Sequence, residues 1–277
     1  MSASEWVIER KTFATDLKFE GIGLHSGEPV RMNVMPSDGA GIVFRYGTDL
    51  YKATVENVSD TTRCTSIGPV RTVEHFMSAL AAAEVTDCVI ELTAPELPSL
   101  DGSSLPYIQA FDRIGYETLS SYEIAPLFER IFVQEEGVKV AISAGEGHWA
   151  YDFVSPSRYP FCNSIETSDV IRDYRDQIAP ARTWAFEEQV ETLRELGLGS
   201  GLDLASALVI GQEGFVNEPR LPKEPARHKL LDLIGDLYLC GIPIRYLNVH
   251  AVASGHKVAV LAAAKLRGSL KVPEPVA

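Results

Sequence analysis

Residues 226–240 constrain the fold more than any other stretch, because their apolar and polar side chains separate cleanly at a helical period. His228, Asp232 and Asp236 are spaced four apart, so they line one face of the predicted helix. Pro225, just ahead, suits the first helical turn. Another face is apolar and predicts a buried stripe, which comprises Leu230, Leu231, Ile234, Leu237 and Tyr238.

The line of one imidazole and two carboxylates on this helix has two interpretations. The commoner one is a solvated face on which a histidine and an aspartate lie one turn apart. The other is a metal pair, because a histidine and a carboxylate four apart on a helix can bind the same Zn²⁺. A third ligand from elsewhere in the chain would decide between them, and the segment alone leaves both open.

Composition narrows the class of protein. The chain has 277 residues, of which 45% are hydrophobic and 23% charged, and this suits one large or two medium globular domains. The net charge of −13 disfavours nucleic acid as a partner. An anionic substrate would therefore need a local cluster of Lys, Arg and His that works against the overall field.

Targeting and redox signals favour a cytoplasmic protein. No apolar run approaches the roughly 20 residues that a membrane helix needs, and the first nine residues lack a basic segment followed by an apolar core. The cysteines Cys64, Cys88, Cys162 and Cys240 are far apart and form no CxxC pair. This spacing suits a reducing cytosol and disfavours a disulfide framework or a cysteine zinc site. We expect neither a transmembrane segment nor an export signal.

The first half of the chain is predicted to be rich in strands. Val30, Met32 and Val34 alternate with polar residues, as in a half-buried strand. Residues 41–46 and 87–92 are further strand candidates. A helix follows in this half, at residues 71–84, and another begins near Leu105 after a loop in which Asp101 and Ser103 are interpreted as turn and cap residues.

Two features of this half could carry chemistry. His25 lies in a glycine-punctuated loop and faces either solvent or a ligand. Thr72 is a predicted N-cap, which places Glu74 and His75 in the first turn of their helix. The helix dipole there favours a carboxylate and a neutral imidazole, the states that a general base and a metal ligand require. A glutamate placed only for the helix dipole and a histidine on the surface are an equally good interpretation.

The second half repeats the order of strands followed by helices, after a break in the pattern at residues 120–126. His256 follows its last predicted strand, where simple exposure is favoured over catalysis. The predicted elements are a hairpin of 130–134 and 138–143, a helix at 185–196 with Phe186, Val190 and Leu193 inward and Gly197 closing it, and a strand at 246–253.

Taken together, the motifs resemble those of the UDP-3-O-acyl-N-acetylglucosamine deacetylases, zinc hydrolases of lipid A synthesis. The resemblance covers nearly the whole chain, from about residue 9 to residue 266. The matching segments are TVEH at 72–75, RHKLLDLIGD at 227–236, SGH at 254–256, GIGLH at 21–25, LDGS at 100–103 and ART at 181–183.

The resemblance implies a metal site and answers the question of the third ligand by analogy. His75, His228 and Asp232 would bind one Zn²⁺ per chain and leave a fourth position for water. The nitrogen and oxygen donors are also compatible with Fe²⁺.

The resemblance also implies catalytic roles. Glu74 would be the general base, and His256 the general acid, with Asp236 orienting the imidazole. Thr183 would donate its hydroxyl to the oxyanion, and Lys229 would bind the diphosphate or assist at the oxyanion. The substrate-binding residues would be His25, Lys229 and Thr183.

The fold implied by the resemblance is α+β, with two domains of similar topology. Each domain would be a mainly antiparallel sheet with two helices packed on it, and the active site would lie between the helix layers. The expected domains are residues 6–121, carrying Glu74 and His75, and residues 126–267, carrying His228, Asp232 and His256.

The function implied is zinc-dependent hydrolysis of the N-acetyl group of UDP-3-O-acyl-N-acetylglucosamine, giving acetate and the free amine. Two alternatives stay open: a metal-dependent deacetylase of a different acylated amino sugar, and a catalytically silent relative that binds sugar nucleotides. The expected partner is a UDP-linked acylated amino sugar, with residues 193–204 lining a passage for its acyl chain. The oligomeric state is unknown, with a monomer expected.

Two positions depart from the family pattern. Family members often carry Lys where this chain has Ala253, and a His-Pro pair where it has Tyr159 and Pro160. Both departures concern substrate contacts or nearby loops, so they affect the expected nucleotide contacts and leave the ligand set intact.

Overall fold

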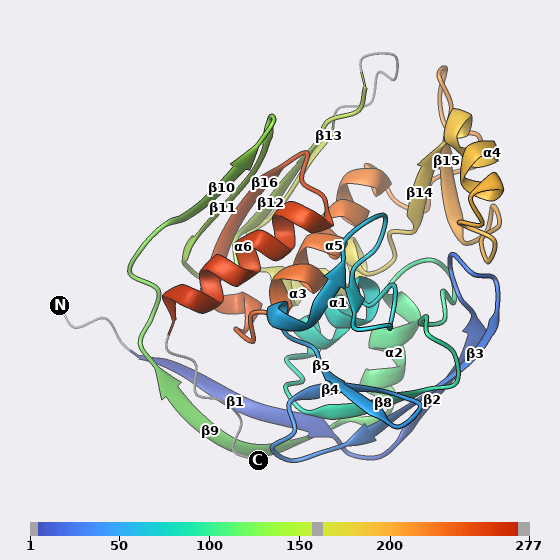
Figure 1. Cartoon of the computed structure of the whole chain (residues 1–277). Helices are drawn as coiled ribbons and strands as arrows, with labels where there is room; N and C mark the ends of the chain where they lie inside the picture. The colour runs from blue at the N-terminus through green and yellow to red at the C-terminus, as the bar shows by residue number, and fades with distance from the viewer. Residues whose placement is uncertain (1–4, 157–162, 271–277) are drawn as a thin grey trace.

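Two five-stranded sheets, one from each half of the chain, form the outer layers of the protein (Figure 1). The computed structural model describes residues 5–156 and 163–270. Tyr159 and Pro160 therefore lie outside the described residues. In spatial order the first sheet contains β2 (Leu17–Ile22), β3 (Pro29–Pro36), β8 (Cys88–Leu92), β4 (Ile42–Tyr46) and β5 (Asp49–Lys52).

The second sheet has the same strand order as the first. It contains β10 (Ile131–Glu135), β11 (Val138–Ala144), β16 (Leu247–Val252), β12 (Trp149–Phe153) and β13 (Asn163–Thr167). In each sheet the strand that comes last in the chain is central and pairs in parallel with one neighbour, while the other pairings are antiparallel. The expectation of two similar, mainly antiparallel sheets is confirmed.

The predicted hairpin of β10 and β11 is confirmed, with a loop one residue shorter than expected because Glu135 belongs to β10. Glu135 pairs with Val138, which leaves a two-residue loop. Both loop residues have positive φ angles, 42° at Glu136 and 88° at Gly137. This backbone matches the twist of the flanking strands, and glycine adopts it without steric cost.

The helices fill the space between the two sheets. Helix α1 (Glu74–Ala83) packs against α5 (Glu224–Tyr238), so that the helix layers of the two halves meet (Figure 1). Every residue of α1 is buried, and α5, α2 (Leu105–Ile114) and α3 (Val170–Asp173) pack against it. The other helical segments described are α4 (Glu187–Glu195), α6 (His256–Ser269) and the short η1 (Val55–Asn57), η2 (Tyr174–Ile178) and η3 (Ile244–Tyr246).

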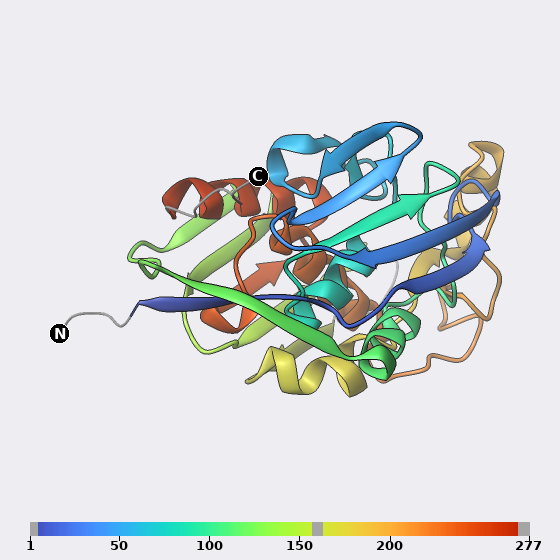
Figure 2. The same ribbon diagram turned by 90° about the horizontal axis from the view of Figure 1, so that it is seen from below.

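A two-stranded ribbon joins the halves. Strand β1 (Trp6–Phe13) pairs antiparallel with β9 (Tyr116–Ile124), and Figure 2 shows the two strands crossing the molecule together. Trp6 stacks on Tyr246 of the second half, with ring centroids 5.1 Å apart. The break expected at 120–126 therefore begins inside β9. The division into domains at 6–121 and 126–267 stays a prediction.

The predicted helix at 185–196 is wrong at its start. Residues Thr183–Phe186 form strand β14, which pairs in parallel with β15 (Ala207–Ile210), and α4 begins only after it. All of α4 is described, and none of its residues is buried, so Val190 and Leu193 do not face a core. The reason is visible in Figure 1, where β14, α4 and β15 project away from the two sheets. Gly197, at φ +69°, does end this helix.

The remaining short strands are β6 (Val58–Asp60) and β7 (Ser66–Ile67), which pair with each other.

No helix within residues 5–156 and 163–270 has the length and apolar character needed to cross a membrane.

Candidate metal centre and active site

The polar line on α5 is buried. His228, Asp232 and Asp236 expose 3%, 4% and 1% of their surfaces, so the solvated-face interpretation is wrong. The reason is the contact between α5 and α1, which covers this face with the other half of the chain. Gly235 lets the backbones meet, because a Cβ there would lie 2.0 Å from the carbonyl oxygen of Glu74.

The start of α1 differs from the sequence prediction. Thr72 does not cap the helix, because its backbone is left-handed (φ 59°) and its hydroxyl donates to Glu96 Oε1 at 3.0 Å. The helix begins at Glu74, so Glu74 and His75 do lie in its first turn, as predicted. Both side chains are buried, which removes the surface interpretation.

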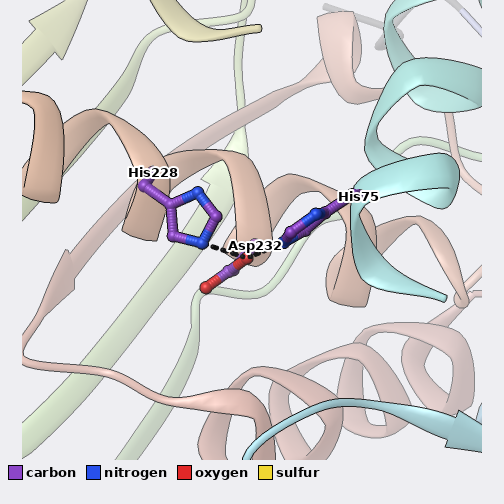
Figure 3. A group of neighbouring side chains, drawn as sticks. All are labelled: His75, His228 and Asp232. Atoms are coloured by element: carbon purple, nitrogen blue, oxygen red, sulfur yellow. Dashed lines mark ion pairs between the residues drawn. The ribbon is translucent and has the colours of Figure 1, made fainter. Parts of the chain in front are cut away.

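Three side chains from the two helices converge on one point (Figure 3). His75 Nε2 lies 3.5 Å from Asp232 Oδ1, and His228 Nε2 lies 3.4 Å from the same oxygen. One ligand atom from each residue lies within 4.8 Å of the others, so the group could hold a metal ion. His228 Nδ1 faces the carbonyl of Ala181 at 3.1 Å, which directs Nε2 at the shared point. Burial lowers the pKa of His228 to about 4, so the ring is a neutral ligand at pH 7.

The predicted acid–base group, Glu74, Asp236 and His256, lies beside these candidate ligands. His256, the first residue of α6, faces Asp236 Oδ2 through Nδ1 at 2.9 Å, and its Nε2 lies 4.0 Å from Glu74 Oε1. Burial raises the pKa of Glu74. Burial also works to lower the pKa of His256, but the negative charge of Asp236 and its hydrogen bond outweigh this and bring the pKa to about 9. His256 is therefore an imidazolium at neutral pH with only 11% of its side chain exposed, so the simple exposure expected from the sequence is wrong.

In the metal-free protein, Asp236→Asn is expected to lower the pKa of His256 from about 9, because the charge of Glu74 is then left to oppose the effect of burial without that of Asp236. Since the folded pKa is raised, the stabilising effect of the pair is fully present below about pH 6.5. It is lost as the pH rises through about 9. Histidine NMR titration and urea unfolding at several pH values would measure both effects.

A variant far from the site serves as the control for this titration. Asp152→Asn on β12 removes the partner of the exposed His250 and should leave the pKa of His256 unchanged. If Asp236→Asn also left it unchanged, the Asp236 carboxylate would not be what keeps His256 charged.

The three candidate ligands, Glu74 and His256 line a cavity of about 260 Å³. The remaining predicted site residues line it too. Lys229 donates Nζ to Asp232 Oδ2 at 2.8 Å, and the negative charge of Asp232 outweighs burial and raises the Lys229 pKa. Thr183 opens β14 at the rim. His25 is 8% exposed, and burial lowers its pKa. The cavity wall also includes four residues of the predicted acyl passage, Leu193, Leu198, Gly199 and Leu202.

Comparison with known proteins adds the deciding observation. The family model described as UDP-3-O-acyl N-acetylglycosamine deacetylase matches residues 10–267. The chain belongs to this deacetylase family. Proteins named UDP-3-O-acyl-N-acetylglucosamine deacetylase resemble it along most of their length. The one from Neisseria meningitidis is 36% identical, over 91% of this chain and 90% of its own.

Two further deacetylase relatives show similar coverage. The protein from Syntrophus aciditrophicus is 33% identical over 90% of this chain and 83% of its own, and that from Chromobacterium violaceum is 35% identical over 91% and 86%. The family model's match at residues 10–267 spans both halves of the chain and the positions of all the motif segments described above.

A buried ion pair of this deacetylase-family chain was missed by the sequence reasoning. Arg182 Nε donates to Glu224 Oε1 at 3.0 Å, and both side chains are almost fully buried. Glu224 also accepts the backbone N–H groups of Arg182 and Arg220, at 2.9 and 2.7 Å. The pair ties Thr183 to the first turn of α5, one turn before His228. Because Glu224 stands just ahead of the RHK motif and belongs to none, only its place before a helix could have signalled it.

Glu224→Ala is expected to destabilise the protein by about 3–5 kcal/mol, because it leaves the Arg182 guanidinium buried and unpaired. Urea unfolding monitored by circular dichroism would measure the loss. The matched control is Glu56→Ala, which removes a surface pair with Arg267 at 3.0 Å and should cost at most about 1 kcal/mol. Equal losses for the two variants would contradict a structural role for the buried pair.

Proposed function

We propose that the protein hydrolyses the N-acetyl group of UDP-3-O-acyl-N-acetylglucosamine, releasing acetate and the free amine, with one Zn²⁺ per chain. Family membership and the names of the relatives support the substrate. The observation that carries the chemistry is the convergence of His75, His228 and Asp232 beside Glu74. A place in lipid A synthesis, a cytoplasmic location and a monomeric state belong to the same proposal.

The ligand group fits Zn²⁺. Ligand atoms about 2.0–2.2 Å from a tetrahedral ion lie about 3.3–3.6 Å from one another, and the two imidazole nitrogens lie 3.4 and 3.5 Å from Asp232 Oδ1. That oxygen is buried and accepts no hydrogen bond from residues 5–156 or 163–270. A buried carboxylate oxygen without a donor is costly unless a cation binds it.

The protein groups around this site suit amide hydrolysis. Bound Zn²⁺ would supply Lewis acidity, polarising a carbonyl oxygen and acidifying water. Glu74 would take the proton of the attacking water, because its carboxylate lies in the cavity next to the ligand His75. The buried position of Glu74 raises its pKa, which strengthens it as a base.

Departure of the amine needs a proton and charge stabilisation. His256 would donate that proton from Nε2, while Asp236 holds Nδ1 and fixes the orientation of the ring. The hydroxyl of Thr183 and the ammonium of Lys229 would stabilise the oxyanion that forms on the acetyl group. Each of these side chains except Asp236 lines the cavity.

The cavity also suits the two ends of the proposed substrate. His25 and Lys229 would contact the diphosphate, the lysine as a cation and the histidine as a neutral hydrogen-bond donor, since burial lowers its pKa. Leu193, Leu198 and Leu202 would contact the acyl chain, which is apolar. The cavity wall therefore offers polar side chains to the charged diphosphate and apolar side chains to the acyl chain.

Acetate release by the purified, zinc-loaded protein tests this function. UDP-3-O-acyl-N-acetylglucosamine should be turned over, and the same sugar nucleotide without the 3-O-acyl chain should react far more slowly. Equal rates on both compounds would indicate a different acylated amino sugar as the substrate. No acetate release with Zn²⁺ or Fe²⁺, together with nucleotide binding, would indicate a silent binding protein.

A further inference from the structure

Thr65 lies outside every motif, yet it touches both carboxylates of the acid–base group. It sits in the loop between β6 and β7 and is fully buried. Its backbone N–H donates to Glu74 Oε2 at 3.0 Å, and its hydroxyl donates to Asp236 Oδ1 at 2.5 Å. Its carbonyl accepts the N–H of Val73 at 3.2 Å, just before α1 begins.

These contacts close a ring of four residues. Thr65 binds one oxygen of Glu74 and one oxygen of Asp236, and the other oxygens of both acids face His256. His256 Nδ1 lies 2.9 Å from Asp236 Oδ2, and Nε2 lies 4.0 Å from Glu74 Oε1. The ring joins the loop and α1 of the first half to α5 and α6 of the second.

We propose that Thr65 is a positioning residue that fixes the orientation of the Glu74 and Asp236 carboxylates for the reaction. The proposal rests on the proposed deacetylase function and deepens it. With Oε2 held by Thr65, Glu74 presents Oε1 to the cavity and to water. With Oδ1 held by the threonine hydroxyl, Asp236 presents Oδ2 to His256.

The physical reason is the rotational freedom of a carboxylate. The two oxygens of a carboxylate are equivalent, so the orientation of the carboxylate plane is what matters. A buried carboxylate without a donor on one oxygen could turn about its last bond and direct both oxygens away from the group it must contact. A fixed donor on one oxygen of each acid removes that freedom before the substrate binds. Because the hydroxyl of a threonine beside a carboxylate must donate, the direction of this hydrogen bond is set by chemistry.

Thr65→Val tests the hydroxyl alone, because valine keeps the shape, the β-branch and the backbone N–H. We expect kcat to fall by roughly 10- to 150-fold, as for the loss of a hydrogen bond to a charged group, while KM and the zinc content stay within about twofold of wild type. Thr65→Ser keeps the hydroxyl and should restore most of kcat.

The matched control is Thr12→Val, at another buried threonine whose hydroxyl donates to the carbonyl of Asp87 at 2.7 Å. It should lower the thermal midpoint about as much as Thr65→Val and leave kcat unchanged. If both variants lost kcat in proportion to their stability, Thr65 would have a structural role only.

A double-mutant cycle shows whether Thr65 acts through Asp236. In an Asp236→Asn background, Thr65→Val should cost less than about threefold in kcat, because its target is already altered. A full additional loss of the single-variant size would overturn the proposed route through Asp236.

A second readout does not depend on activity. In the metal-free protein, hydrogen exchange at His256 Nδ1, followed by nitrogen-edited NMR, should be at least about tenfold faster in Thr65→Val than in wild type or Thr65→Ser, because Asp236 is no longer held. An unchanged exchange rate would refute the positioning role. Altered exchange in a protein that releases no acetate would instead uphold the ring and refute the proposed function.

Discussion

Glu74→Gln is expected to lower acetate release by about 10²- to 10⁴-fold, the range that a positioned general base contributes. Glutamine has the same shape and can still accept the N–H of Thr65 through its amide oxygen, but it cannot take a proton from water. Because Glu74 is not one of the three converging ligands, the zinc content should stay at one per chain. Steady-state kinetics and metal analysis on the same preparation would separate the two effects.

The control for Glu74→Gln is Glu91→Gln, at an exposed position of β8 where the same chemical change should leave turnover as it is. Normal turnover by Glu74→Gln would show that another group accepts the proton. Loss of zinc from this variant would instead mean that Glu74 is a ligand.

His75→Ala is expected to release the metal and reduce acetate formation to background. The variant removes the only ligand that the first half contributes to the described group, leaving His228 and Asp232 on α5. Changes to groups that merely support a ligand weaken metal binding by about 10- to 100-fold, so the loss of a ligand should cost at least the upper figure. Metal analysis after dialysis would measure it, beside acetate release.

His250→Ala offers a matched control for this second variant. His250 also lies near a carboxylate, Asp152 at 2.8 Å, but it is half exposed on the outer face of the second sheet. This variant should keep its zinc and its activity. Zinc retained in full by His75→Ala would show that the convergence of the three side chains does not bind the ion.

Local sequence patterns predicted many of the helices and strands, whereas the family resemblance predicted the α+β fold and the set of three converging side chains. The helical period placed His228, Asp232 and Asp236 on one face of α5, and alternation located strand β3. Whether the polar face of α5 met water or protein could not be read locally, because the covering helix α1 lies some 150 residues away in the chain.

Contacts between segments that lie far apart in the chain could not be predicted from the sequence. Thr65 and Asp236 are 171 positions apart, and a single threonine in a loop carries no pattern that predicts its partner. Strand β14 was missed because it has only four residues and runs directly into the helical Glu187–Glu195. Gly235 did carry a signal, since a glycine inside a helix is costly unless something packs closely against it.

The matched strand orders of the two sheets have a consequence for how such a site can evolve. Helices α1 and α5 hold equivalent places, each preceding the central strand of its sheet. Two identical subunits of a symmetric dimer would have to change together, whereas two similar units in one polypeptide can change separately. Here they differ in what they give: one unit supplies a single imidazole and the neighbouring acid, and the other an imidazole with a carboxylate. Because the two units are joined in one chain, each can contribute different side chains to the shared site, which two identical subunits could not do.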